Sequence, residues 1–506
     1  MKISPLRLLT FCSLLSFTSP LFSEEKEEQK EKPEPKADSI TFDLPSVDSE
    51  VEIDGKTIAY TVSADTLTLK TNDGKDRASI FHVSYLRKVD EEQRSERPVM
   101  FAFNGGPGSS AVWLHLGALG PKLVPTSEDG TQALAPPITL IDNAHSILDV
   151  TDLVFIDPVS TGYSRTEADG SPKDFHGLEG DIESVADFIR RWTTENKRWS
   201  SPKYLLGESY GGIRAAGLAE RLQSRYGMSL NGVVMLSSLL DFRTLRGSQG
   251  DFLVHQIYLP TFASTAHFHG KIDRDRNELL AEATAFATGP YASALYSGNN
   301  LSKAEIQGLT QKLAELTAIP AHIWEETNLR LSPTRFRREL LRSENKVLGR
   351  FDSRVAWPAQ QKDRDYPTYD PSYSVVYGAF STAMLSYLTE DLGANEIEMP
   401  YEILTGKVHP WNWDSQNKVV NLSSRIQSAM TDNPHLRILI MGGYTDLATP
   451  LTGIEYSVSQ LVDLPQESRD NISVTTYEAG HMFYLNKPDL IKMRTDLVEF
   501  IQSSAE

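Results

Sequence analysis

A serine in the first half of the chain is flanked by small residues in a spacing that suits nucleophilic chemistry. The stretch Gly207-Glu208-Ser209-Tyr210-Gly211 has the form G-x-S-x-G. It follows Tyr204-Leu205-Leu206, which has the pattern of a buried strand end, and it precedes the helical sequence IRAAGLAERL. We expect a tight strand-to-helix turn that lifts the Ser209 hydroxyl above a sheet, at the N-terminus of the next helix.

A carboxylate and a histidine follow this serine in the chain order of an α/β-hydrolase triad. Asp446 comes just after the apolar run LRILIMGG, and His481 comes just after SVTTYEAG. A histidine can accept the proton of the serine as general base, while a carboxylate orients its ring. Taken alone, Asp446 would fit the cap of a helix, and His481 would fit a histidine in a turn. The ordered set of three favours a triad of Ser209, Asp446 and His481.

A glycine-rich segment, FNGGPGSS at residues 103–110, adds a third element of this chemistry. It follows an apolar run, and its glycines allow backbone N–H groups to approach a substrate closely. A donor in this segment and the N–H of Tyr210 can together form an oxyanion hole. The alternative of a phosphate loop is not supported, because the Lys-Ser/Thr ending of such a loop is absent.

The surrounding elements predict an α/β fold with a mostly parallel central sheet and helices on both faces. Residues 51–88 alternate apolar and polar side chains and carry turn signals, which predicts antiparallel strands. Buried strands are then expected to alternate with helices such as DIESVADFIRRWTTEN. The expected buried strands are residues 98–103, 152–157, 203–207, 232–238, 436–443 and 473–480.

From residue 245 to residue 385 the strand signal lapses, and stretches rich in Ala, Leu and Glu take over. This pattern predicts a helical cap inserted between two parts of the α/β core. The expected division is a signal peptide at 1–23, a charged disordered linker at 24–45, core at 46–244, cap at 245–385 and core at 386–506.

The N-terminal segment has the layout of a secretory signal peptide. Two basic residues precede a short apolar run, and a segment rich in Glu, Lys and Pro follows. The apolar run is too short for a stable transmembrane helix. We therefore expect a secreted or periplasmic protein. An alternative in which Cys12, the single cysteine, carries a lipid is weakened because bulky Phe11 precedes it.

The composition limits the partners and cofactors of the protein. A net charge of -18 argues against nucleic acid or an anionic membrane surface as partner. No later segment is long and apolar enough for a membrane span. We expect no cofactor and no metal, because no cluster of metal-ligating residues stands out; the nearest candidate, VHPWNWD at 408–414, fits a loop with packed tryptophans. The oligomeric state is left open.

Five ordered motifs resemble those of the serine carboxypeptidase family. They are FNGGPGSS, IDPVSTGYS, GESYGG, GGYTDLATP and EAGHM, and they span roughly residues 98–485. The resemblance implies an α/β-hydrolase fold and removal of C-terminal residues from peptides through an acyl-enzyme. It also implies that Gly106 and Tyr210 donate the oxyanion-hole N–H groups. By the same resemblance, Asn104 and Glu208 bind the terminal carboxylate of a peptide with a free C-terminus.

Three positions depart from the family pattern. Ala102 stands where the family has a tryptophan, and Ser109 stands where it has a cysteine. Ala118 replaces a glutamate that supports carboxylate binding in the family, which weakens the prediction of specificity for a free C-terminus. Two other hypotheses therefore stay open. One is an esterase or acyltransferase on the same scaffold, and the other is a binding protein without catalytic activity.

Overall fold

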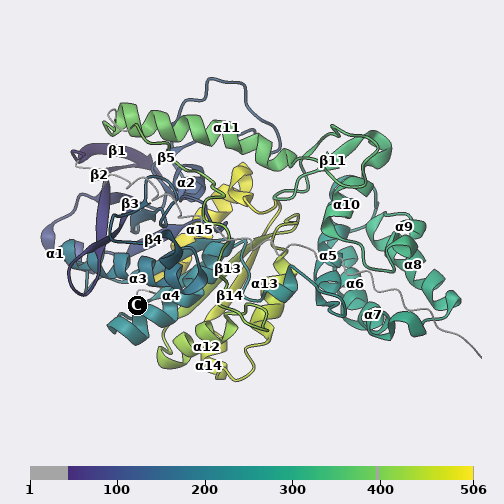
Figure 1. Cartoon of the computed structure of the whole chain (residues 1–506). Coiled ribbons are helices and arrows are strands. Elements are labelled where there is room, and N and C mark those ends of the chain that lie inside the picture. Colours follow the sequence, from purple (N-terminus) through teal and green to yellow (C-terminus); the bar gives the residue numbers. More distant parts are fainter. Residues whose placement is uncertain (1–43, 395–397, 505–506) are drawn as a thin grey trace, which may run out of the picture. The chain divides into compact units, whose positions relative to one another are not determined.

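The computed structural model describes residues 44–394 and 398–504 (Figure 1). The predicted signal peptide at 1–23, with Cys12, lies outside the described residues, as does the predicted linker up to residue 43. Within the described ranges, no helix is both long enough and apolar enough to cross a bilayer.

The described residues form a ten-stranded mixed sheet with the order β1-β2-β3-β7-β4-β9-β10-β13-β14, and the short β8 pairs with β3. The strands from β7 to β14 run parallel to one another, while β1, β2 and β3 pair antiparallel. All six strands expected from the sequence are present, but the one expected as buried at 473–480 is largely half-buried or exposed, because it lies at the edge of the sheet. The strands are β1 (Val47–Ile53), β2 (Lys56–Lys70), β3 (Asp76–Arg87), β4 (Val99–Phe103), β7 (Asp152–Ile156), β8 (Arg165–Thr166), β9 (Lys203–Glu208), β10 (Gly232–Leu236), β13 (Arg437–Gly443) and β14 (Ile472–Tyr477).

Helices cover both faces of this sheet, and strand β4 shows how the two faces are filled. Its residues Val99, Phe101 and Phe103 belong to one apolar cluster, whereas Met100 and Ala102 belong to another. Alternate side chains point to opposite faces of a strand, so a strand buried on both faces is apolar throughout. The first cluster includes residues of α3 (Leu178–Glu195), α4 (Tyr210–Tyr226), α12 (Ser423–Asp432) and α13 (Leu451–Ser459); the second includes residues of α2 (Val112–Leu114), α11 (Pro371–Ser386) and α15 (Lys487–Ser504).

A group of helices between β10 and α11 has an apolar core of its own (Figure 1). Phe262 stacks on Phe336 within it, with 4.0 Å between ring centroids. The helices are α5 (Leu253–Phe268), α6 (Arg276–Phe286), α7 (Ala292–Ser297), α8 (Lys303–Thr317), α9 (Ala321–Glu326) and α10 (Pro333–Glu339). A short hairpin of β11 (Lys346–Leu348) and β12 (Ala356–Pro358) follows them.

Helix α11 lies within the predicted insertion at 245–385 except for its last residue, Ser386, but packs differently from the helices before it. Its residues Phe380 and Met384 join the apolar cluster that covers the central sheet. Shorter elements complete the fold: α1 (Glu91–Glu96), α14 (Gln466–Arg469), and a β5 (Lys122–Leu123) and β6 (Ile141–Asp142) ladder.

Candidate active site

Ser209 occupies a strained turn between β9 and α4. Its backbone torsions are φ 61° and ψ −126°, in a region that residues other than glycine rarely adopt. The backbone N–H of Ser209 donates to the carbonyl of Leu236 at 3.0 Å, which ties the turn to the neighbouring strand β10. The predicted strand-to-helix turn is therefore present, with the serine at the first residue outside the helix.

The glycines around Ser209 are required by close contacts. A Cβ atom on Gly207 would lie 2.1 Å from the carbonyl oxygen of Gly211, and one on Gly211 would lie 2.8 Å from the carbonyl oxygen of Phe103. Both distances are too short for non-bonded atoms, and both obstacles are backbone atoms. The close packing of the turn therefore explains the glycines on either side of the serine.

Asp446 and His481 meet at the carboxyl ends of β13 and β14. His481 Nδ1 lies 2.8 Å from Oδ2 of Asp446, and both side chains are buried. The other carboxylate oxygen accepts the backbone N–H groups of Ala448 and Thr449, at 2.7 and 2.9 Å. This carboxylate is held in place by the loop that follows its own strand.

Thr449 also contacts the Asp446–His481 pair, and nothing in the sequence indicated this contact. Its hydroxyl lies 2.9 Å from Oδ2 of Asp446 and 2.9 Å from Nδ1 of His481, and it donates to the carbonyl of Ser237 at 2.6 Å. The hydroxyl therefore links the acid, the histidine and the end of β10.

The environment of His481 favours its protonated form. Burial by itself lowers the pKa of the imidazole, but the charge of Asp446 and its hydrogen bond more than offset that effect. The pKa of His481 is consequently raised above its ordinary value. The raised pKa means that His481, in its neutral form, is a stronger base toward a neighbouring hydroxyl than an ordinary histidine.

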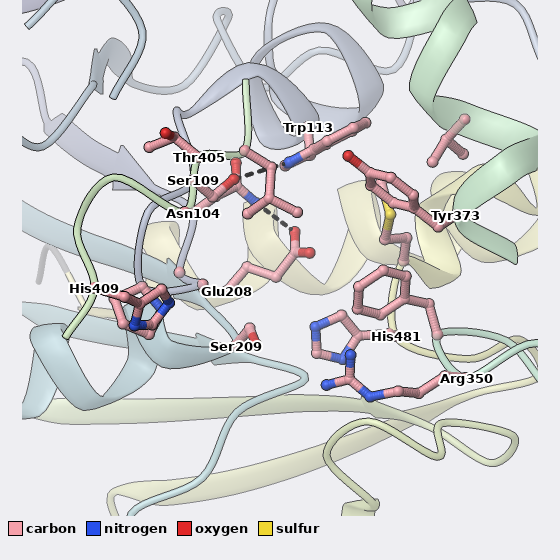
Figure 2. Close-up of a pocket in the computed structure, with 18 residues that line it drawn as sticks. Asn104, Ser109, Trp113, Glu208, Ser209, Arg350, Tyr373, Thr405, His409 and His481 are labelled. Atoms are coloured by element: carbon pink, nitrogen blue, oxygen red, sulfur yellow. Dashed lines mark hydrogen bonds between the residues drawn. The ribbon is translucent and has the colours of Figure 1, made fainter. Parts of the chain in front are cut away.

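Ser209 and His481 both line a pocket of about 390 Å³ (Figure 2). The glycine-rich segment forms another part of its wall through Gly105 and Gly106. A Cβ atom on Gly105 would lie 2.4 Å from the backbone nitrogen of Tyr210, so this segment packs directly on the start of α4. The two residues predicted to form the oxyanion hole, Gly106 and Tyr210, thus belong to adjoining backbone segments.

Glu208 and Asn104, the residues predicted to bind a carboxylate, form a hydrogen-bonded pair in this pocket (Figure 2). Asn104 Nδ2 donates to Oε2 of Glu208 at 2.9 Å. Burial raises the pKa of Glu208 to about 7, although the charge of His481 and the hydrogen bonds from Tyr484 and Asn104 act to lower it. Glu208 is therefore largely protonated at mildly acidic pH.

Tyr484 is a second partner of Glu208 that the sequence did not indicate. Its hydroxyl donates to the same atom, Oε2, at 2.8 Å. Ala118, the position of the family's supporting glutamate, is buried in the helical turn η1 (His115–Leu119). In this chain a tyrosine, rather than a second carboxylate, contacts Glu208. Ser109, at the position of the family's cysteine, accepts a hydrogen bond from Trp113 Nε1 at 2.9 Å.

A segment from the insertion, residues 350–354, is hydrogen-bonded to both loops that carry Asp446 and His481. The carbonyl of Phe351 accepts the N–H of His481 at 2.5 Å, and the carbonyl of Arg350 accepts the N–H of Leu447 at 3.1 Å. The ring of Phe351 stacks on that of His481, with 5.2 Å between centroids. This segment therefore helps to fix the positions of the candidate acid and base.

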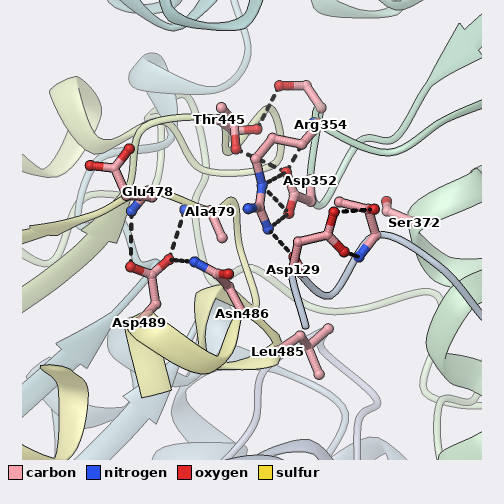
Figure 3. A network of polar contacts seen from close by, with 12 residues as sticks. Asp129, Asp352, Arg354, Ser372, Thr445, Glu478, Ala479, Leu485, Asn486 and Asp489 are labelled. Carbon is pink, nitrogen blue, oxygen red and sulfur yellow. Dashed lines mark hydrogen bonds and ion pairs between the residues drawn. The ribbon is translucent and has the colours of Figure 1, made fainter. Parts of the chain in front are cut away.

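Side-chain contacts reinforce this arrangement (Figure 3). Asp352 accepts a hydrogen bond from Thr445 at 2.9 Å and pairs with Arg354 at 2.7 Å. Arg354 also donates to the carbonyl of Asp129 at 2.9 Å. On the other side of the loop, Asp489 accepts the backbone N–H groups that precede His481. The loops around the candidate triad are thus tied to the insertion and to the core.

The sheet order, the strained serine turn and the buried aspartate–histidine pair define an α/β-hydrolase. A family model described as serine carboxypeptidase matches residues 69–483, and the chain belongs to that family. Among curated protein sequences, no match to the chain is found.

Several solved structures are similar over most of the chain. A proline iminopeptidase from Mycobacterium smegmatis shares 14% identity, over 88% of this chain and 99% of that one, with a TM-score of 0.39. A carboxyl esterase from Bacillus coagulans shares 11% identity, over 88% and 99% of the two chains, with a TM-score of 0.37. An esterase from Thermogutta terrifontis shares 9%, over 88% and 100%, with a TM-score of 0.35. No activity follows for this chain from likenesses of this size.

Proposed function

We propose that this protein is a serine carboxypeptidase that removes C-terminal residues from peptides. The proposal rests on one observation, namely that the candidate nucleophile and base share a pocket with the residues predicted to bind a carboxylate. The pocket combines Ser209 and His481 with a largely protonated Glu208 and its partner Asn104. A hydroxyl nucleophile with its base, next to a group that can donate to a carboxylate, suits the terminal residue of a peptide.

In the proposed reaction, Ser209 Oγ attacks the carbonyl carbon of the last peptide bond and its proton passes to His481. Asp446 holds the opposite ring nitrogen and stabilises the imidazolium. The N–H groups of Gly106 and Tyr210 stabilise the oxyanion. His481 then protonates the leaving amine, which departs and leaves an acyl-enzyme on Ser209. Water, activated by His481, attacks the ester carbon and restores the serine.

Glu208 and Asn104 are proposed to bind the terminal carboxylate of the substrate. Oε2 of Glu208 already accepts two hydrogen bonds, so the proton of the neutral acid is expected on Oε1, where it can be donated to the substrate. Asn104 Oδ1 accepts the N–H of Leu114 at 3.2 Å, which fixes the orientation of its amide group. The second N–H of that amide is then available for the substrate.

The test compares a peptide with a free C-terminus with its amidated twin and with a simple ester. We expect release of single C-terminal residues from the free peptide, detected by mass spectrometry, and much slower cleavage of the amide. Equal cleavage of both peptides, with internal cuts, would contradict the proposal. An ester turned over faster than both peptides would favour the esterase or acyltransferase hypothesis.

We also propose that the mature protein is secreted or periplasmic, on the strength of the N-terminal sequence pattern. N-terminal sequencing of the protein recovered from its native cells tests this. A mature start near residue 24 supports export, whereas a retained residue 1 contradicts it.

A further inference from the structure

Arg350 brings a positive charge to the pocket beside the candidate base. Among the eighteen described residues that line the pocket, it is the only lysine or arginine (Figure 2). Its backbone is fixed, because its N–H donates to Asp370 Oδ1 at 2.9 Å and its carbonyl accepts from Leu447 at 3.1 Å. The side chain is exposed to solvent at this position.

Three carboxylates that lie close to Arg350 in the chain or belong to the candidate triad have other side-chain partners. Asp352 pairs with Arg354 at 2.7 Å, and Asp446 pairs with His481 at 2.8 Å. Asp370 accepts the hydroxyl of Ser372 at 2.6 Å. Within residues 44–394 and 398–504, the guanidinium of Arg350 forms no ion pair and no hydrogen bond, and it lies over the ring of Phe351, 5.1 Å from the ring centroid.

We propose that Arg350 binds a side-chain carboxylate of the substrate, on one of the two residues that flank the scissile bond. The enzyme would thereby prefer peptides with Asp or Glu next to the cleaved bond. This inference rests on the proposed carboxypeptidase function and adds its substrate class. In Figure 2 Arg350 and the Asn104–Glu208 pair occupy separate places, with His481 between them in that view. The side-chain carboxylate and the terminal carboxylate therefore have different partners.

The experiment uses two pairs of peptides with free C-termini, one with Glu or Gln at the last position and one with Glu or Gln at the position before it. At about pH 6 the glutamate side chain is ionised. For each enzyme variant, kcat/KM is measured for the Glu peptide and for the Gln peptide of a pair. The quantity compared between variants is the first value divided by the second. For an exposed ion pair we expect a ratio of about threefold to fivefold in one peptide pair, and that pair identifies the subsite.

Arg350→Gln should bring that ratio close to one, and Arg350→Lys should retain part of it. The matched control is Arg364→Gln, since Arg364 is an exposed arginine of the same insertion whose side chain donates hydrogen bonds to Gln361 and Tyr366, away from the pocket residues. The control should keep the wild-type ratio. Because each ratio is taken within one variant, a general loss of activity does not affect it.

Two results would overturn the inference. A wild-type ratio near one in both peptide pairs would show that no side-chain carboxylate is recognised. An unchanged ratio in Arg350→Gln would show that Arg350 does not recognise the carboxylate; if kcat/KM also falls equally for the Glu and Gln peptides, Arg350 acts only through the charge it places near His481. If no peptide is cleaved at all, the proposed function is contradicted, and this inference with it.

Discussion

The hydroxyl of Tyr484 donates a 2.8 Å hydrogen bond to the buried carboxyl group of Glu208. Tyr484 follows His481 by three residues, and Glu208 directly precedes Ser209. The contact therefore joins the loop of the candidate base to the turn of the candidate nucleophile. It also places a hydrogen-bond donor on the group proposed to receive the substrate's terminal carboxylate.

The first prediction concerns the pH dependence of substrate binding. Glu208 has a pKa of about 7, so it loses its proton as the pH rises through neutrality. The ionised form cannot donate to the substrate carboxylate and repels it. We expect KM for free peptides to rise between about pH 6 and 8, and KM for amidated twins to change less. Catalysis also needs neutral His481, so kcat should rise over the same pH range, and the two effects oppose each other in kcat/KM.

Glu208→Gln provides the control, because glutamine donates at every pH and should flatten the KM profile. Stability offers an independent check. The folded-state pKa of Glu208 lies above the ordinary value of 4.5, so its contribution to stability is full below about pH 4.5 and is lost as the pH rises through about 7. The stability of the wild type relative to Glu208→Gln should decline over that window. A KM that is flat in the wild type would contradict the proposed role.

A second prediction separates Tyr484 from Glu208. The hydrogen bond from Tyr484 acts to lower the pKa of Glu208, so Tyr484→Phe should raise that pKa further. We expect the rise in KM to move to higher pH, while the peptide is still bound at acidic pH. The measurement is KM against pH for the free peptide. An unshifted profile would mean that Tyr484 does not influence the carboxyl group.

The third prediction concerns Thr449. Thr449→Val removes the hydroxyl that contacts both Asp446 and His481 but keeps a similar volume. Loss of such a contact costs about 1 kcal/mol, so kcat should fall roughly fivefold. Thr449→Ser should recover most of the activity. If Thr449→Val retains full kcat, the Asp446–His481 contact alone orients the ring.

The fourth prediction compares two glycines. A Cβ atom on Gly207 would overlap the carbonyl oxygen of Gly211, whereas one on Gly378, in α11, meets nothing within 4 Å. Gly207→Ala should lose activity and be destabilised by about 3 kcal/mol or more, on the scale of severe backbone strain. Gly378→Ala should be neutral or stabilising by about 0.5–1 kcal/mol, because alanine is the better helix former. Thermal unfolding of both variants measures this; equal effects would rule out a strained serine turn.

The sequence predicted those parts of the site that leave a local signature. Ser209 lies between a buried strand and a helix, and glycine spacing marks its turn because only glycine fits there. Asp446 and His481 each follow a segment predicted as a strand, and parallel strands bring their carboxyl ends to one edge of a sheet. The fold class and the positions of the six strands could be predicted from such patterns, although the pattern did not show that β14 lies at the edge of the sheet and is only partly buried.

The remaining site residues have no such signature. Thr449 and Tyr484 act through contacts that depend on how separate loops pack, and their residue types are common in any sequence. Arg350 and Phe351 belong to the insertion and reach the site because backbone hydrogen bonds tie their segment to the loops of Asp446 and His481. Spacing along the chain carries no information about a contact formed between segments so far apart.

The most direct test of the account is the rate at which the C-terminal residue is released from a peptide by the wild type and by Ser209→Ala. The hydroxyl of Ser209 lies at a turn on the pocket wall, so its removal should leave the fold and thermal unfolding unchanged. The account predicts that the wild type releases single C-terminal residues and that Ser209→Ala is slower by about 10⁴-fold or more. Release by folded Ser209→Ala within about tenfold of the wild-type rate would contradict it.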